Sequence, residues 1–258
     1  MKINLSKLLK LKKTNKNVTA NETEYIIDDN TTFCVLESYK TARTNIMFSL
    51  PKSDKGKIVL ITSSEPAEGK TTTSINLSYT FAQTDAKVIL IECDLRKPRL
   101  HRYLRIDRGV GMSNVLCGFA TLDEAIRKGV KGNMDCITAG EIPMNSAELL
   151  MSDEMDAILD ELSQRYDYIF IDTPPVMTVT DAMILAPKSS GTVLVVRQET
   201  STYDVIDKTV DLMKQSGIKI LGFIFKMSPE SSNKLWDAKR ADRYAYKYLY
   251  NYRDTSND

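Results

Sequence analysis

The fold is decided by the stretch Lys57-Ile-Val-Leu-Ile-Thr-Ser-Ser-Glu-Pro-Ala-Glu-Gly-Lys-Thr-Thr-Thr-Ser-Ile-Asn-Leu77. It is typical of an apolar strand, a short loop and the start of a helix. Backbone N–H groups at such a helix start bind phosphate, the lysine reaches the β and γ phosphates, and the first threonine hydroxyl is a Mg²⁺ ligand. The sequence therefore predicts a nucleotide triphosphate site. Its expected binding residues are Glu68, Gly69, Lys70, Thr71 and Thr72.

The loop departs from the usual G-x-x-x-x-G-K pattern in two ways. Ser63 and Ser64 occupy the region of its first glycine, and Ala67 stands where a loop glycine is common. Alanine disfavours backbone conformations with positive φ, so it limits how the loop can fit a phosphate. Because a bare Gly-Lys-Thr also occurs by chance, the prediction needs support from other parts of the chain.

Two later segments support it, since each is an apolar run that ends in acidic residues. They are Val88-Ile-Leu-Ile-Glu-Cys-Asp-Leu-Arg96 and Tyr168-Ile-Phe-Ile-Asp-Thr-Pro-Pro175. Buried parallel strands have this composition, and ligands bind at their carboxyl ends. The alternative is that these acids only cap strand ends. The acids expected near metal and phosphate are Glu92, Asp94 and Asp172.

The composition fits an ordinary α/β domain. Of 258 residues, 42% are hydrophobic, and 35 Lys and Arg balance 34 Asp and Glu, which favours neither a nucleic-acid partner nor an anionic membrane. The four cysteines lack C-x-x-C spacing, so we expect reduced thiols in a cytoplasmic protein. His101, the one histidine, has no Cys or carboxylate at metal spacing.

Alternating strand and helix patterns predict a P-loop NTPase-type α/β fold, with a mostly parallel sheet and helices on both faces. We expect a polar and basic linker over 1–31, a domain over 32–235 that begins with a helix at about 35–50, and a tail over 236–258. The linker either stays solvated or touches a membrane through a short basic turn. The helices expected later in the domain include 122–129 and one long helix over 146–166.

These motifs resemble those of the bacterial P-loop tyrosine kinases that serve capsule and exopolysaccharide synthesis, in their cytoplasmic two-polypeptide form. That family belongs to the MinD-like branch of P-loop ATPases. The resemblance covers about residue 32 to the C-terminus, and the segment 89–98 is its most diagnostic part. It implies a protein-tyrosine kinase that uses ATP and Mg²⁺. The catalytic residues it implies are Lys70, Asp94, Glu92 and Asp172, and the metal residues are Thr71, Glu92, Asp94 and Asp172.

Roles within this set differ. Lys70 would stabilise phosphate charge, and Asp94 is expected to orient or deprotonate the attacking phenol, with Glu92 nearer the metal. Arg96 and Lys97 either contact phosphate or pair with acids. Where the family usually has an asparagine that reads adenine, the segment runs Ile224-Phe-Lys-Met227, so Lys226 is either a substitute contact or irrelevant.

The C-terminal segment places five of the chain's twelve tyrosines at alternate positions. A segment that presents phenols to an active site is one interpretation, and an aromatic edge strand or packing helix is the other. The resemblance favours the first, because tyrosine clusters there are the autophosphorylated substrate. The expected phosphoacceptors are Tyr244, Tyr246, Tyr248, Tyr250 and Tyr252.

The helix at about 35–50 carries a charge pattern that bears on oligomerisation. Glu37, Lys40 and Arg43 are three residues apart and share one face, similar to the family's E-x-x-R-x-x-R oligomerisation motif. The resemblance implies a homo-oligomeric ring that phosphorylates tails in trans, although Lys40 replaces an arginine and loses a bidentate contact. A solvated charged stripe is the alternative. The implied partners are a membrane-bound polysaccharide co-polymerase, which recruits and activates the kinase at the cell membrane, and a cognate tyrosine phosphatase.

Two other functions use the same motifs. One is a nucleotide-switched scaffold or partitioning ATPase that never phosphorylates tyrosine. Such proteins usually carry a second lysine early in the loop, where this chain has Glu65, and they lack a tyrosine tail. The other is an interaction module with weak catalysis, which Ala67 and Lys226 suggest.

Overall fold

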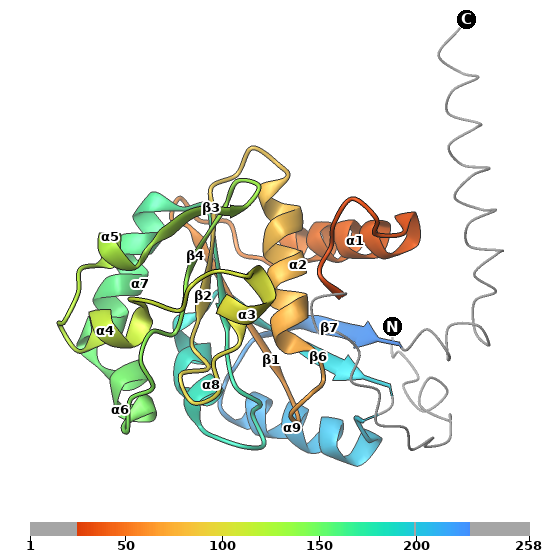
Figure 1. Ribbon diagram of the computed structural model, residues 1–258. Coiled ribbons are helices and arrows are strands. Elements are labelled where there is room, and N and C mark those ends of the chain that lie inside the picture. The colour runs from red at the N-terminus through yellow and green to blue at the C-terminus, as the bar shows by residue number, and fades with distance from the viewer. Residues whose placement is uncertain (1–24, 199, 228–258) are drawn as a thin grey trace, which may run out of the picture.

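The computed structural model describes residues 25–198 and 200–227. Within them, strands form one sheet in the order β3-β4-β2-β5-β1-β6-β7, and Figure 1 shows helices on both of its faces. β3 is antiparallel to β4, and the other neighbours are parallel. This confirms the predicted fold class. The strands are β1 (Lys57–Ser63), β2 (Val88–Glu92), β3 (Arg127–Lys131), β4 (Met134–Ile137), β5 (Tyr168–Asp172), β6 (Gly191–Arg197) and β7 (Ile220–Lys226).

The helices divide between two hydrophobic cores, one on each face of the sheet. The first core receives side chains from α1 (Phe33–Ser49), α2 (Lys70–Ala82) and α3 (Leu100–Leu104). The second is covered by the remaining helices. These are α4 (Met112–Leu116), α5 (Leu122–Ala125), α6 (Ser146–Met151), α7 (Asp153–Arg165), α8 (Asp181–Leu185), the 3-10 turn η3 (Ala186–Lys188) and α9 (Tyr203–Gln215).

The central strands are apolar throughout because both faces are covered. In β1, Val59 and Ile61 enter the first core and Leu60 enters the second, and all three are fully buried. Such a strand shows no alternation of polar and apolar residues, which is typical of a parallel sheet between two helix layers. Its carboxyl end therefore has a rigid, buried support.

The chain before α1 packs against α2. The backbone N–H of Ile27 donates to Asn76 Oδ1 at 2.9 Å, and Asn76 Nδ2 donates to the Tyr25 carbonyl at 2.8 Å. Ile27 itself is buried. These contacts place residues 25–27 against the helix that follows the phosphate loop. The predicted boundaries of the linker and the tail lie largely outside the described residues and stay predictions.

Two expected helices are wrong in part. The helix expected over 122–129 ends at Ala125, and the chain continues as β3 into a hairpin in which Gly129 and Gly132 have φ near +60°. The long helix expected over 146–166 is two helices, α6 and α7, which meet at Ser152. The Ser152 hydroxyl accepts the Met155 N–H at 3.4 Å, so it starts a new helix there.

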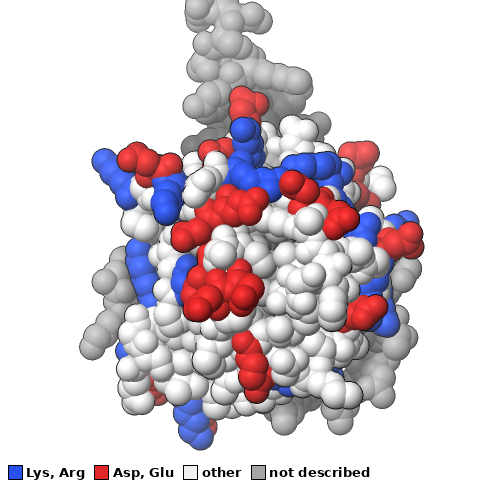
Figure 2. Space-filling model, turned by 90° about the vertical axis from the view of Figure 1, so that its left-hand side faces the viewer, with Lys and Arg blue, Asp and Glu red and all other residues white. Residues whose placement is uncertain are grey.

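The surface carries mixed charge on one large face. Figure 2 shows acidic and basic side chains interspersed with broad uncharged areas on the side that carries α4 to α7 in Figure 1. On this face no field of one sign dominates. Among the described residues, no helix combines the length and apolar character needed to cross a bilayer.

Candidate active site

The phosphate loop lies at the carboxyl edge of the sheet, between β1 and α2. Gly69 precedes the helix with φ +85°, a left-handed conformation that glycine adopts readily. The first backbone bond of the helix runs from the Thr73 N–H to the Gly69 carbonyl. Within the described residues, the N–H groups of Lys70, Thr71 and Thr72 have no acceptor. Three free donors at the positive end of a helix fit an anion such as a phosphate group.

Contacts with the end of β6 hold the middle of the loop. The Glu68 carboxylate is buried, accepts the Ser201 hydroxyl, and accepts the Glu65 N–H at 3.0 Å. Arg197 Nη1 donates to the Ala67 carbonyl at 3.4 Å. Burial raises the pKa of Glu68, and the hydrogen bonds oppose that rise. The side chain of Glu68 thus fixes the loop, and its predicted part in nucleotide binding stays a prediction.

The structure brings together Lys70, Thr71, Asp94 and Asp172. Lys70 Nζ lies 3.2 Å from Asp94 Oδ2, which joins the loop to the residue two positions after β2. Asp172, the last residue of β5, is fully buried and accepts the Ser74 hydroxyl at 2.9 Å. The predicted cluster of residues from three strand ends is therefore present.

Asp172 has the features of a cation ligand. Its Oδ2 is buried and accepts no hydrogen bond from the described residues. Burial raises its pKa to about 6, while the charge of Lys70 and the hydroxyl of Thr71 lower it. Such an orphaned acidic oxygen beside a threonine hydroxyl fits Mg²⁺, which prefers one or two protein oxygens together with phosphate and water.

Glu92 lies beside Asp172 in the pairing of β2 with β5, but its carboxylate is occupied by backbone donors. Its Oε1 accepts the N–H groups of Arg99 at 2.5 Å and Leu100 at 2.7 Å, and its Oε2 accepts that of Ala139 at 3.0 Å. Burial raises its pKa to about 7, against these three donors. Among the described residues, no three His, Cys, Asp or Glu side chains gather as a metal site. The geometry favours a structural role for Glu92, and its predicted metal role stays untested.

Arg96 pairs with an acid, which is one of the two alternatives left open by the sequence. Its guanidinium donates to both oxygens of Asp181, each at 3.0 Å, and Asp181 is fully buried. This bidentate pair joins the segment after β2 to the start of α8. The Lys97 N–H donates to Asp94 Oδ1 at 3.1 Å, which further fixes the Asp94 carboxylate.

Sequence reasoning missed three contacts of the site. Ser74 lies one helical turn after Lys70, so its position beside Asp172 could have been found from the period of the helix. Ser201 lies in the segment before α9, and no local pattern connects it to Glu68. Lys226 donates to the Thr72 hydroxyl at 2.6 Å, and this depends on the pairing of β7 with β6.

The predicted oligomerisation residues lie on α1. Glu37 and Lys40 pair with each other at 2.8 Å. Arg43 Nη1 donates to the Thr80 carbonyl of α2 at 2.5 Å, within the same chain. The same helix exposes Phe48 by 85%. The expected phosphoacceptors, 244–252, lie outside the described residues.

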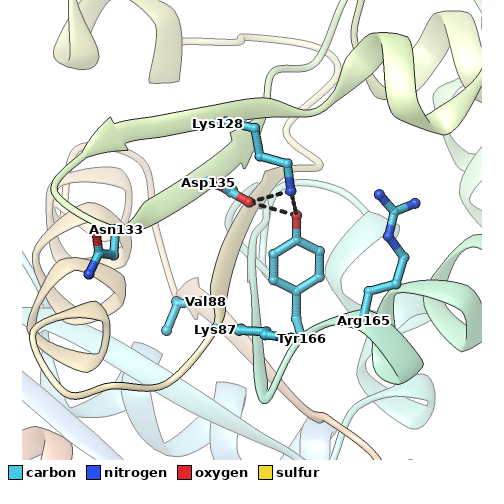
Figure 3. A pocket seen from close by; sticks show the side chains of 7 residues that line it. All are labelled: Lys87, Val88, Lys128, Asn133, Asp135, Arg165 and Tyr166. Atoms are coloured by element: carbon cyan, nitrogen blue, oxygen red, sulfur yellow. Dashed lines mark hydrogen bonds and ion pairs between the residues drawn. The ribbon is translucent and has the colours of Figure 1, made fainter.

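A hollow of about 310 Å³ lies at the opposite edge of the sheet, where β2 and β4 begin. Figure 3 shows the Tyr166 hydroxyl, Lys128 and Asp135 pointing toward one another within it. Tyr166 donates to Asp135 Oδ2 at 2.7 Å, and Lys128 Nζ contacts Asp135 at 2.8 Å and the Tyr166 oxygen at 2.9 Å. These contacts join β3, β4 and the end of α7, remote from the phosphate loop.

Comparisons with known proteins agree with this geometry. The AAA domain model matches residues 56–216. The chain is 37% identical over 206 residues to the tyrosine-protein kinase YwqD of Bacillus subtilis, covering 79% of this chain and 86% of that protein. Several other tyrosine-protein kinases are longer, and the chain spans only 27% or 28% of their length.

Solved structures of a tyrosine kinase domain and of a related ATPase are also similar to this chain. The kinase domain of the Escherichia coli tyrosine kinase ETK superposes with a TM-score of 0.74 at 32% identity, covering 78% of this chain and 79% of that one. The septum site-determining protein MinD of Pyrococcus horikoshii, complexed with Mg-ADP, superposes with a TM-score of 0.56 at 26% identity, covering 69% and 76%.

Proposed function

Because the chain belongs to the family of bacterial tyrosine-protein kinases, we propose that its principal substrate is its own C-terminal tyrosine cluster. It is an ATP- and Mg²⁺-dependent enzyme that transfers phosphate to protein tyrosine. The phosphoacceptors are Tyr244, Tyr246, Tyr248, Tyr250 and Tyr252. The observation that supports this proposal is the meeting of Lys70, Thr71, Asp94 and Asp172 at one edge of the sheet.

Each residue of the cluster has a separate task. The N–H groups of Lys70 to Thr72 and the Lys70 ammonium bind the phosphates of ATP and stabilise their charge during transfer. Thr71 and Asp172 hold Mg²⁺, which neutralises charge on the phosphate oxygens when it is bound. Asp94 accepts or orients the proton of the tyrosine hydroxyl, and its distance of 3.2 Å from Lys70 places proton acceptor and phosphate-binding cation side by side.

The proposal is tested by incubating the purified protein with Mg-ATP and mapping phosphotyrosine by mass spectrometry. In Lys70→Ala we expect phosphotyrosine on residues 244–252 to fall at least 100-fold, because the cation that stabilises the transferred charge is removed. Lys214→Ala, an exposed lysine on α9, is the matched control and keeps full activity. ADP release without phosphotyrosine in the unaltered protein would instead support a MinD-like scaffold ATPase.

The biological setting is part of the same proposal. We infer that the kinase regulates capsule or exopolysaccharide synthesis at the inner face of the cell membrane, to which a membrane-bound co-polymerase recruits it, and that a tyrosine phosphatase reverses its modification. The chain spans about a quarter of the length of several longer tyrosine-protein kinases. Adding the cytoplasmic end of the co-polymerase encoded beside the kinase is expected to raise phosphotyrosine formation several-fold. No change in rate would contradict this activation.

We also propose that the chain forms a homo-oligomeric ring through Glu37, Lys40 and Arg43. The exposed Phe48 on the same helix supports a contact between copies through α1. In such a ring, the tail of one copy enters the active site of the next.

A further inference from the structure

A second lysine contacts the phosphate loop from the β7 side of the sheet. Lys226 is the last residue of β7, and its Nζ donates to the Thr72 hydroxyl at 2.6 Å. The side chain also lies against Gly69, since a Cβ built there would be 2.7 Å from Lys226 Nζ and 2.8 Å from its Cδ. The ammonium therefore lies over the start of α2, next to N–H groups that have no acceptor among the described residues.

This ammonium has no acidic partner in the part of the chain that the structure describes. The ion pairs there do not include it. The charged group that acts on it is Arg197 at the end of β6, which repels it, and burial together with that repulsion lowers its pKa to about 8. Its other neighbours are the Thr72 hydroxyl and the Tyr25 ring, whose centre is 5.7 Å away. A poorly solvated cation without a counterion favours the binding of an anion.

The order of the strands places the contacts of the two lysines on opposite sides of β1. β1, which leads into the loop, has β5 and then β2 on one side, and β6 and then β7 on the other. Lys70 reaches toward the β2 side, where it meets Asp94. Lys226 approaches from the β7 side. Because transfer takes place near Asp94, the terminal phosphate belongs at the β2 side, and the inner phosphate with the nucleoside belongs at the β7 side.

We propose that Lys226 binds the inner phosphate of the nucleotide, so that it contributes equally to the affinity for ATP and for ADP and little to the transfer step. The inference rests on the nucleotide site described above. It gives Lys226 a phosphate-binding role in place of a contact with the base. It also separates two functions, since Lys70 acts on the group that is transferred and Lys226 on the part of the nucleotide that stays behind.

The test is the affinity for ADP measured by calorimetry at several NaCl concentrations. We expect Lys226→Met to weaken ADP binding about tenfold, as the loss of one charge-assisted hydrogen bond would. We also expect its affinity to depend less on salt, because one cation–phosphate interaction is gone. Lys226→Arg keeps the charge and is expected to stay within about threefold of the unaltered protein. Lys219→Met, an exposed lysine just before β7, is the matched control and changes neither quantity.

Further measurements separate the alternatives. In phosphotyrosine assays, Lys226→Met is expected to raise the KM for ATP with kcat nearly unchanged. Undiminished ADP affinity in Lys226→Met would overturn the proposal. A loss of affinity with an unaltered salt dependence would also overturn it, because it would assign Lys226 to the base or to the shape of the loop. Since ADP binding needs no tyrosine transfer, failure of the kinase proposal would appear separately, as bound ADP without phosphotyrosine.

Discussion

Ala67 is the residue at which the phosphate loop is strained. The sequence indicated that alanine would limit positive φ, yet the structure has Ala67 at φ +64°. The left-handed region costs a residue with a Cβ about 1–2 kcal/mol, and glycine adopts it freely. The contact of Arg197 with the Ala67 carbonyl and that of Ser201 with Glu68 hold the loop in this conformation, so the strain resides where the phosphates are proposed to bind.

Replacing Ala67 by glycine should therefore stabilise the protein. Relief of the strain exceeds the greater freedom of glycine in the unfolded chain, so we expect Ala67→Gly to raise the free energy of unfolding by up to about 1 kcal/mol. Urea denaturation measures this. Ala42→Gly, inside α1, is the control and should destabilise by about 1 kcal/mol. Equal destabilisation by both variants would show that the loop at Ala67 is unstrained.

Glu92 gives the free energy of unfolding a pH dependence. Its pKa is about 7 in the folded protein and about 4.5 in the unfolded chain. Between these values the folded state binds more protons, so the stabilising contribution is present below pH 4.5 and is lost as the pH rises through 7. The loss is about 3 kcal/mol, at 1.36 kcal/mol for each pH unit of difference. Asp172, whose pKa is about 6, contributes in the same direction.

Urea denaturation at pH 5 and pH 7.5 tests this assignment. Glu92→Gln cannot ionise, so its free energy of unfolding should change less between the two pH values than that of the unaltered protein. Glu124→Gln is the control, since hydrogen bonds from Thr121 lower the pKa of that exposed carboxyl by more than burial raises it. If Glu92→Gln keeps the full pH dependence, another group is responsible.

The site residues also show what the sequence could predict. Lys70, Thr71, Asp94 and Asp172 were predictable because each follows or ends a parallel strand, and such ends share one edge of the sheet. Glu92 and Asp94 are two positions apart, so alternation along a strand does not tell which one faces the phosphates. That choice depends on the backbone N–H groups of 99, 100 and 139, which donate to Glu92 only once the chain has folded.

At the scale of elements, the errors have identifiable causes. Ser152, followed by Asp153 and Glu154, is a helix start signal inside an apolar pattern that continues through it, and the pattern concealed the signal. The segment 122–129 has helical spacing, but Gly129 and Gly132 permit a tight hairpin, and β3 gains a partner in β4 that helix propensity alone cannot anticipate.

The hydroxyl of Tyr166 stabilises that hairpin. In Figure 3 it joins Asp135 of β4 and Lys128 of β3. Removing a buried hydrogen bond leaves part of the Asp135 carboxylate unsatisfied, so we expect Tyr166→Phe to lower the free energy of unfolding by about 1–2 kcal/mol. Tyr168→Phe keeps the edge-on ring contact with Phe81 at 4.7 Å and should change it by less than about 0.5 kcal/mol. Equal effects of the two variants would show that the hydroxyl contacts contribute nothing.

At the scale of the whole molecule, the two hydrophobic cores support the strands, and the site residues gather at the carboxyl edge of the sheet. Two cores enclose the strands, so the edge of the sheet where Lys70, Asp94 and Asp172 meet has little freedom to move. The tyrosines proposed above as substrates, 244–252, lie outside the residues that the structure describes. A kinase that phosphorylates its own tail can do so within one chain or between chains, and the α1 interface proposed above requires the second.

Mixing two variants distinguishes these possibilities. One is Lys70→Ala, which keeps its tail tyrosines and lacks the cation at the phosphates. The other has all five tyrosines of 244–252 replaced by phenylalanine and keeps an intact site. Transfer between chains is expected to place phosphotyrosine on the Lys70→Ala chain, at a rate that rises with protein concentration and falls when Phe48→Asp introduces charge into the α1 contact. Phosphotyrosine that forms in the unaltered protein at a concentration-independent rate, with none on Lys70→Ala in the mixture, would mean that each chain phosphorylates itself and that no ring is needed.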